Sequence, residues 1–219
     1  MYRYERKFRS HLYDLKDLVA LVKSNRALFM ETYSPRVVNS IYLDTNSYSF
    51  AQDNLAGISD RVKPRVRWYG QQDKEIKDGV LELKYKNNLL GRKEKYLLGS
   101  LTIAKSSFRN QLNNKLGILW QDNPNLRFLK ELNASLMTRY NRRYFESGDR
   151  KFRITIDTDI HYWSFSQFGR RVEHPYKDHD LIILELKYDQ DVSGLQEVLR
   201  DFPFRFSKSS KYVTGILST

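Results

Sequence analysis

The sequence contains no cysteine among its 219 residues, and it has only four histidines. Disulfide bonds, zinc sites with thiolate ligands and cysteine nucleophiles are therefore excluded. The sequence also lacks an apolar run near the roughly 20 residues that a helix needs to cross a bilayer. Met1 leads directly into the charged stretch from Tyr2 to Arg9, which does not resemble a signal peptide. We therefore expect a cytoplasmic protein, and a position at the cytoplasmic face of a membrane stays open.

Hydrophobic residues make up 40% of the chain, and its aromatic residues are 12 Phe, 15 Tyr and 3 Trp. This composition is sufficient for a buried core. The length fits one generous domain or two very small ones, and no change in composition marks a linker. We therefore expect a single domain over residues 1–219.

Basic residues are in excess, with 38 Lys and Arg against 26 Asp and Glu, so the formal net charge is +12. Such a charge raises the local concentration of anions around the molecule. An acidic partner is therefore expected. The net charge alone does not separate nucleic acid, an anionic membrane surface, nucleotides and inorganic polyphosphate.

The hydrophobic pattern changes between a helical period and a period of two along the chain. The helical period and its end signals predict helices over residues 12–24, from 46 or 47 to 57, 101–116, 125–136 and 193–201. The period of two predicts strands over 2–9, 37–43, 61–69, 79–86, 137–145, 152–160 and 181–188. This order favours an α+β fold, a closed antiparallel β-barrel tunnel of about eight strands with helices packed outside. A half-open sheet is the alternative.

Each predicted strand has one charged face and one apolar face, because successive side chains point to opposite sides. The charged faces carry Glu5, Lys7 and Arg9; Arg61, Lys63, Arg65 and Arg67; Glu82, Lys84 and Lys86; Tyr140, Arg142 and Tyr144; Arg153, Thr155, Asp157 and Asp159; and Glu185 and Lys187. One interpretation is that these are the solvent faces of a half-exposed sheet. If the helices cover the apolar faces, however, the charged faces meet around a hydrated lumen. Its excess positive charge costs several kcal/mol per unpaired ion, so an anion such as polyphosphate or a nucleoside triphosphate is expected there.

Eight short segments in order resemble the VTC domain, the polyphosphate polymerase module of the vacuolar transporter chaperone complex and a member of the triphosphate tunnel metalloenzymes. The segments are Tyr4-Glu5-Arg6-Lys7-Phe8, Ser40-Ile41-Tyr42-Leu43-Asp44-Thr45, Arg65-Val66-Arg67-Trp68-Tyr69-Gly70, Leu81-Glu82-Leu83-Lys84, Tyr140-Asn141-Arg142, Arg153-Ile154-Thr155-Ile156-Asp157, Leu184-Glu185-Leu186-Lys187 and Phe206-Ser207-Lys208-Ser209-Ser210-Lys211-Tyr212-Val213. They span nearly the whole chain.

The resemblance implies an eight-stranded antiparallel tunnel in which the terminal phosphate of ATP is transferred to a growing inorganic polyphosphate chain. It also implies a divalent metal, Mn²⁺ or Mg²⁺, with Glu185 as its ligand. The phosphate-binding residues carried over are Lys7, Arg65, Arg67, Lys84, Tyr140, Arg142, Ser210 and Lys211. Of these, Lys7, Arg65, Arg67, Lys84 and Arg142 are expected to be catalytic. The charged faces add Arg61, Lys63, Lys86, Arg153 and Lys187 as substrate-binding residues.

The sequence departs from the family pattern at two positions. Asn54 stands where the eukaryotic catalytic subunit has an Arg, so one phosphate contact is missing unless Arg61 or Lys63 replaces it. Arg3 stands where the triphosphatase branch has the first Glu of its Glu-x-Glu-x-Lys motif, which points away from metal-dependent hydrolysis. An SPX domain and membrane helices are not seen, so a stand-alone version is expected, and a separate membrane-protein partner stays open.

Other interpretations remain at this point. The chain can be a tripolyphosphatase or nucleoside triphosphatase of the same fold, or a non-catalytic module that binds polyphosphate or RNA. Nucleic acid is not expected, because Trp68 falls on the strand face opposite Arg67. Glu185 can simply pair with Lys187, Tyr140 can be a rim aromatic, and Lys211 can belong to a solvated turn. Asp157 and Asp159 are interpreted as structural, and Lys93 and Lys95 as residues near an entrance. The oligomeric state is not determined by the sequence.

Overall fold

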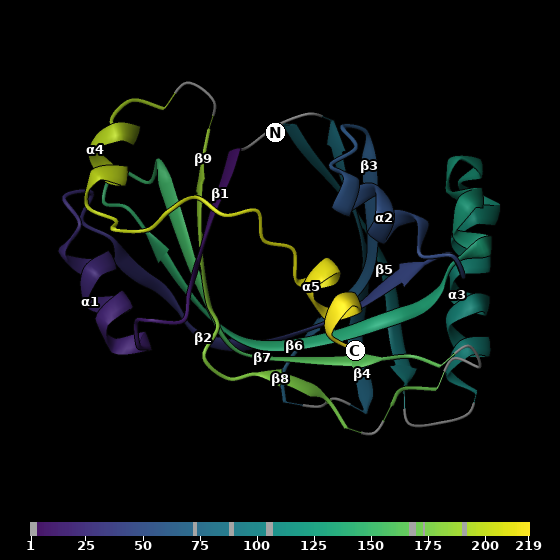
Figure 1. Cartoon of the computed structure of the whole chain (residues 1–219). Helices are drawn as coiled ribbons and strands as arrows, with labels where there is room; N and C mark the ends of the chain where they lie inside the picture. Colours follow the sequence, from purple (N-terminus) through teal and green to yellow (C-terminus); the bar gives the residue numbers. More distant parts are fainter. Residues whose placement is uncertain are drawn as a thin grey trace. The chain divides into compact units, whose positions relative to one another are not determined.

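The computed structural model describes residues 4–71, 74–87, 90–103, 107–166, 170–172, 174–189 and 192–219. These residues form an α+β fold dominated by one sheet, and its pairings β1–β9, β9–β7, β2–β3, β3–β4 and β4–β5 are antiparallel (Figure 1). The strand order is β1 (Tyr4–Ser10), β9 (Ile182–Tyr188), β7 (Phe152–Ser164), β6 (Asn133–Glu146), β2 (Met30–Asp44), β3 (Arg61–Tyr69), β4 (Glu75–Asn87) and β5 (Leu90–Thr102), and β8 (Tyr176–Asp178) pairs with β7.

The predicted fold class is confirmed, whereas the predicted closure of the barrel is not. The strand order begins with β1 and ends with β5, and no hydrogen-bonded pairing among the described residues joins these two strands. Hydrogen bonds in the described part of the chain therefore do not close the sheet.

The chain divides into two compact units. Unit 1 comprises the described residues within 1–37, 140–160 and 177–210, and unit 2 those within 38–139, 161–176 and 211–219. The strands β2, β6 and β7 are long enough to contribute to both units.

The apolar strand faces of unit 1 are covered by two helices, α1 (Leu15–Ser24) and α4 (Leu195–Arg200). The Asp14 side chain caps the N-terminus of α1 by accepting a hydrogen bond from the backbone N–H of Asp17 at 2.8 Å. The buried cluster of this unit consists of Phe8, Leu18, Val22, Phe29, Phe145, Phe152, Ile154, Ile156, Ile182, Leu184, Leu186, Tyr188, Val198 and Phe202. It contains Leu184 and Leu186, which form the apolar face of β9, as the alternation of polar and apolar residues in the sequence predicts.

Unit 2 has its own core, which packs α3 (Phe108–Asp122) and the 3-10 helix η1 (Pro124–Glu131) against the apolar faces of its strands. Trp68, Leu81 and Leu83 are among the buried residues of this core. Two further helices are α2 (Ser49–Ala56), which ends at Gly57 with φ +75°, and α5 (Lys211–Ser218). In α5, Gly215 packs so closely on Leu136 and Tyr162 that a Cβ atom there would clash with both.

Several predicted elements differ from the structure. Residues 101–102 belong to β5, so α3 begins at Phe108 and not at 101, and residues 133–136 belong to β6 and not to a helix. The strand β5 is not predicted, because its charged run from Arg92 to Lys95 has no alternation of polar and apolar residues. The helix α5 is also not predicted, because it is only eight residues long and contains a glycine, a poor helix former.

Candidate functional site: two cationic strand faces

The charged face of β3 in unit 2 continues across β4. Arg65 lies opposite Glu82, Lys63 opposite Lys84, and Arg61 opposite Lys86. Side chains directly opposite each other on antiparallel strands share one face of the sheet. The predicted grouping of Arg61, Lys63, Arg65 and Arg67 with Lys84 and Lys86 on one side of these two strands therefore agrees with the strand register.

A row of three lysines crosses this face. Lys84 is the register partner of Lys63 on β3 and of Lys93 on β5. Like charges directly opposite each other on neighbouring strands destabilise a sheet. An arrangement of this kind is favourable when an anion binds over it.

Glu82 is the centre of the same face. It is 4% exposed and is in contact with three cations. Both Nε and Nη2 of Arg65 donate to its Oε2 at 2.9 and 2.6 Å, Arg67 Nη1 lies 3.6 Å from Oε2, and Lys93 Nζ lies 3.3 Å from Oε1. Burial alone would raise the pKa of Glu82, but Arg65, Arg67 and Lys93 hold it far below its ordinary value. Glu82 is thus a carboxylate that orients cations, and the three cations exceed its single charge.

Lys93 is a member of this face that the sequence does not identify as a contact of Glu82. Burial, and then the nearby charges of Arg65 and Arg67, lower the pKa of Lys93 to about 8, although Glu82 acts in the opposite direction. The charge of Lys93 therefore changes near physiological pH. The register partner of Glu82 on β5 is Lys95, which places that residue on the same side.

Arg67 is fixed from the other side by β2. Its Nε donates to Ser40 Oγ at 3.2 Å, and its side chain is buried. Trp68 points into the unit 2 core, so the prediction that it lies opposite Arg67 is confirmed. An aromatic base-stacking role for Trp68 is thereby excluded.

In unit 1, Glu185 lies between two lysines. Lys187 Nζ is 2.9 Å from its Oε1, and Lys7 Nζ is 3.7 Å from its Oε2. Lys7 is also the register partner of Glu185, and Glu5 is the partner of Lys187. Lys7 Nζ further donates to the carbonyl oxygen of Ser209 at 3.2 Å.

Arg142 is buried beside Asp157 in the same unit. Its Nε and Nη2 donate to the two Asp157 carboxylate oxygens at 2.6 and 2.7 Å, and its guanidinium lies 5.2 Å from the Tyr140 ring centroid. Burial alone would lower the pKa of Arg142, but the Asp157 carboxylate raises it well above the ordinary value. Tyr140 is thus packed on Arg142, and Asp157 orients the Arg142 guanidinium, which agrees with the structural interpretation of Asp157.

Thr155 is a residue of this face to which the sequence assigns no role. It is the register partner of Glu185, it is 6% exposed, and its buried Oγ1 has no hydrogen-bond partner among the residues that the structure describes. A buried hydroxyl without a partner is costly in a folded protein. A polar ligand near Glu185 would satisfy this hydroxyl.

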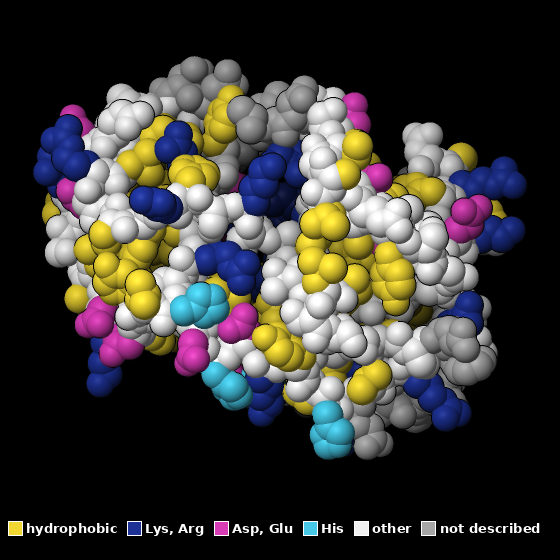
Figure 2. All heavy atoms as spheres, in the orientation of Figure 1, with side chains coloured by type: hydrophobic (Ala, Val, Ile, Leu, Met, Phe, Trp, Pro, Cys, Tyr) yellow, Lys and Arg dark blue, Asp and Glu magenta, His cyan; other side chains and the backbone are white. Residues whose placement is uncertain are grey.

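The remaining predicted residues are distributed over both units. Arg153 is exposed and pairs with Glu146 at 2.9 Å, and Arg61 donates to the carbonyl oxygen of Ile58. Ser210 directly precedes α5 and Lys211 is its first residue, so Lys211 does not lie in a turn. Asn54 is on α2, and Arg3 lies outside the described residues. Figure 2 shows Lys and Arg side chains spread over the drawn face among hydrophobic ones.

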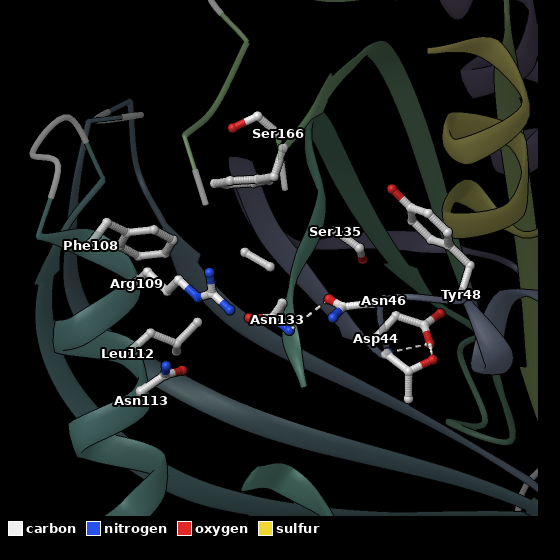
Figure 3. A pocket seen from close by; sticks show the side chains of 13 residues that line it. Asp44, Asn46, Tyr48, Phe108, Arg109, Leu112, Asn113, Asn133, Ser135 and Ser166 are labelled. Atoms are coloured by element: carbon white, nitrogen blue, oxygen red, sulfur yellow. Dashed lines mark hydrogen bonds between the residues drawn. The ribbon is translucent and has the colours of Figure 1, made fainter. Parts of the chain in front are cut away.

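Unit 2 also has a cavity of about 570 Å³, and none of the predicted site residues lines it (Figure 3). Arg109 and Asn113 of α3 lie on one side of it, and Asn133 donates to Asn46 at 3.1 Å on the other. Asp44 in its wall is already satisfied. It accepts hydrogen bonds from the backbone N–H of Thr45, Phe50 and Ala51 and from the hydroxyl of Tyr212, so it holds α2 and α5 in place.

Metal ligands are sparse in the part of the chain that the structure describes, where no group of three or more His, Cys, Asp or Glu lies close enough to hold an ion. A divalent cation that is bound mainly by substrate phosphates and water needs only one or two protein oxygens. Glu185, together with the unpartnered hydroxyl of Thr155, fits this requirement. No helix among the described residues is long and apolar enough to cross a membrane.

Comparison with known proteins gives a family and a fold. The sequence model of the VTC domain matches residues 2–219. A solved structure of a putative adenylate cyclase from Vibrio parahaemolyticus is 15% identical, with a TM-score of 0.52 and coverage of 100% of this chain and 99% of that one. A putative adenylyl cyclase from Hippeastrum with a dominant triphosphatase activity is 14% identical, with a TM-score of 0.48 and coverage of 98% and 94%. No curated protein matches the sequence.

Proposed function

Because this chain belongs to the VTC domain family, we propose that it is a polyphosphate polymerase, which transfers the terminal phosphate of ATP to the end of an inorganic polyphosphate chain. The observation that carries the proposal is the concentration of cations around Glu82. One buried carboxylate contacts Arg65, Arg67 and Lys93, and the row of Lys63, Lys84 and Lys93 lies beside it.

This arrangement fits the binding of a linear polyanion better than it fits a purely structural role. A structural ion pair in a sheet needs one cation for each carboxylate, and three lysines in neighbouring register positions raise the positive potential of this face. A phosphate chain has a negative charge on every unit and can lie along several cations at once. Lys63, Lys84 and Lys86 then contact successive phosphates, and Arg61 extends the same face.

The proposal includes one further element, namely that residues 1–219 act as a single domain. Further substrate-binding residues are then Lys7, Tyr140, Arg142, Arg153, Lys187 and Ser210 in unit 1, and Lys211 at the start of α5. The match of one family model across the whole chain supports a single domain.

The reaction requires positioning and charge stabilisation from the protein rather than covalent catalysis. A terminal oxygen of the polyphosphate acceptor forms a bond to the γ-phosphorus of ATP, the bond from that phosphorus to the bridging oxygen breaks, and ADP leaves with the electron pair. The acceptor oxygen is already anionic, so it needs no general base. Arg65 and Arg67 hold the transferred group through several N–H donors, and Lys84 stabilises charge on its oxygens. Lys7 and Arg142 have the corresponding role of binding phosphate oxygens on unit 1.

A divalent cation, Mn²⁺ or Mg²⁺, is expected to be held by Glu185 and the Thr155 hydroxyl. When bound, such an ion neutralises charge on the β- and γ-phosphates. Lys7 and Lys187 contact the Glu185 carboxylate on both sides, and they therefore fix its orientation.

The experiment is incubation of the purified protein with ATP and Mn²⁺, followed by gel electrophoresis of the products. Polymer longer than triphosphate is the expected result. Free orthophosphate without polymer would identify a triphosphatase that uses water as the acceptor. Binding of RNA in preference to polyphosphate, with no turnover of ATP, would identify a non-catalytic module.

A further inference from the structure

Two tyrosines and an arginine form a cluster on unit 1 that none of the roles above uses. Tyr33 and Arg36 are on β2, and Tyr144 is on β6. The rings of Tyr33 and Tyr144 meet edge to face, with centroids 5.8 Å apart. The guanidinium carbon of Arg36 lies 5.1 Å from the Tyr33 centroid and 5.9 Å from the Tyr144 centroid. We call these three residues the Tyr33 cluster.

The Tyr33 cluster is accessible to a ligand. Tyr33 is 57% exposed, Arg36 is exposed and Tyr144 is half-buried. Aromatic rings and guanidinium planes in this arrangement provide flat surfaces on which a nucleobase stacks, and such stacking tolerates every base because each has a π-face.

The cluster adjoins the cationic face of unit 1. On β6 and β7, Arg142 pairs with Asp157, and Glu146 pairs with Arg153. The strands β6 and β7 run antiparallel, so two residues before Glu146 on β6 lie across from two residues after Arg153 on β7. Tyr144 is therefore across from Thr155. Thr155 in turn is the register partner of Glu185, and Glu185 is that of Lys7. One row therefore leads from Lys7 over Glu185 and Thr155 to the Tyr33 cluster.

The length of this row fits a nucleotide. Neighbouring strands are about 4.8 Å apart, so the row from β1 to β6 spans three intervals, or about 14 Å. An extended nucleoside triphosphate covers such a span, with its phosphates on the lysine and carboxylate end and its base at the aromatic end. Tyr144 is also only two residues from Arg142, about 7 Å along the strand.

We propose that Tyr33, Arg36 and Tyr144 bind the nucleobase of the nucleoside triphosphate substrate by stacking. This assignment rests on the proposed function, because it takes a nucleoside triphosphate to be the phosphate donor. Since stacking does not read the hydrogen-bonding edge of a base, ATP and GTP bind here with similar affinity.

The test compares a ligand that has a base with one that lacks it. Dissociation constants for a nonhydrolysable ATP analogue and for inorganic tripolyphosphate are measured by calorimetry on the full chain and on Tyr33→Leu, which removes an exposed ring. We expect the ATP analogue to bind about tenfold more weakly to Tyr33→Leu, while tripolyphosphate binding is unchanged. Tyr33→Phe keeps the ring and binds both ligands as the parent does.

Tyr13→Leu is the matched control. Tyr13 is a second exposed tyrosine of unit 1 and also meets an aromatic ring edge to face, that of Phe204. Its substitution leaves both dissociation constants unchanged. Equal weakening of both ligands by Tyr33→Leu, or no weakening of either, overturns the nucleobase site even if polymer is made from ATP. A parent protein that binds tripolyphosphate but does not turn over ATP contradicts the proposed function, and the binding comparison still decides the inference. A parent protein that binds neither ligand contradicts both the proposed function and the nucleobase site.

Discussion

Arg142 and Asp157 form a bidentate ion pair in the interior of unit 1. Nε and Nη2 of Arg142 donate to separate carboxylate oxygens of Asp157 at 2.6 and 2.7 Å. The pair fixes the plane of the guanidinium before any ligand arrives. Its net charge is zero, in contrast to the face around Glu82, where three cations share one carboxylate. The two carboxylates therefore differ: Asp157 is paired with one arginine, and Glu82 is in contact with three cations.

Asp157→Asn is expected to destabilise the protein, because it leaves the buried Arg142 cation without a counter-ion. Breaking a buried pair in this way costs about 3–5 kcal/mol, which urea denaturation measures. Glu146→Gln is the control, since it breaks the exposed pair with Arg153, whose loss costs less than about 1 kcal/mol. Addition of tripolyphosphate is expected to restore part of the stability of Asp157→Asn. Equal unfolding midpoints for the two variants would show that Asp157 does not balance a buried charge.

The second prediction concerns pH. The pKa of Lys93 is lowered to about 8, so its ammonium group is charged below pH 8 and neutral above it. Affinity for tripolyphosphate is therefore expected to fall as the pH rises through 8. In Lys93→Arg the side chain stays charged, and this part of the fall disappears. Calorimetric titrations from pH 7 to pH 9 measure the difference. Lys95→Arg serves as the control on the same strand, and a pH profile that Lys93→Arg leaves unaltered would rule out this role of Lys93.

Arg67→Ala is expected to abolish polymer synthesis without unfolding the protein. Arg67 contacts Ser40 and Glu82 and is proposed to donate to the transferred phosphate. The loss of one such donor typically reduces rates about 10²–10³-fold. Initial rates of polymer formation and circular dichroism are the two measurements. Arg26→Ala removes an arginine of a surface pair with Asp201 and leaves the rate unchanged. Full activity in Arg67→Ala would remove Arg67 from the site.

Thr155→Val is expected to raise stability slightly and to weaken metal activation at the same time. The substitution keeps the β-branched shape and deletes a buried hydroxyl that has no partner. Urea denaturation and the Mn²⁺ concentration for half-maximal activity report on the two effects. Thr138→Val is the matched control, because the Thr138 hydroxyl in unit 2 is also buried and without a partner. The role near Glu185 is disproved if both variants require the same Mn²⁺ concentration as the parent.

The alternation of side chains between the two faces of each strand is the part of the site that the sequence predicts well. The strand from Arg61 to Tyr69 is predicted with its exact bounds, and the strand register agrees with the predicted grouping of Arg65 and Arg67 with Glu82. The contact between Lys93 and Glu82 could not be predicted, because the strand that carries Lys93 has no apolar alternation.

The Tyr33 cluster could not be predicted for a related reason. The strand β2 begins at Met30, but its first residues are exposed and include Pro35, so the apolar pattern only starts at Val37. Contacts such as that of Arg36 with Tyr144 depend on which strands are neighbours in the sheet. The hydrophobic period of a strand does not reveal its neighbours. The division into two units likewise has no counterpart in the composition of the chain.

A crystal structure of the protein with a nonhydrolysable ATP analogue and Mn²⁺ tests the central claim most directly. The account predicts a triphosphate within hydrogen-bond distance of Arg65, Arg67 and Lys84. A triphosphate bound away from these three residues, for example in the cavity beside Arg109, would contradict it.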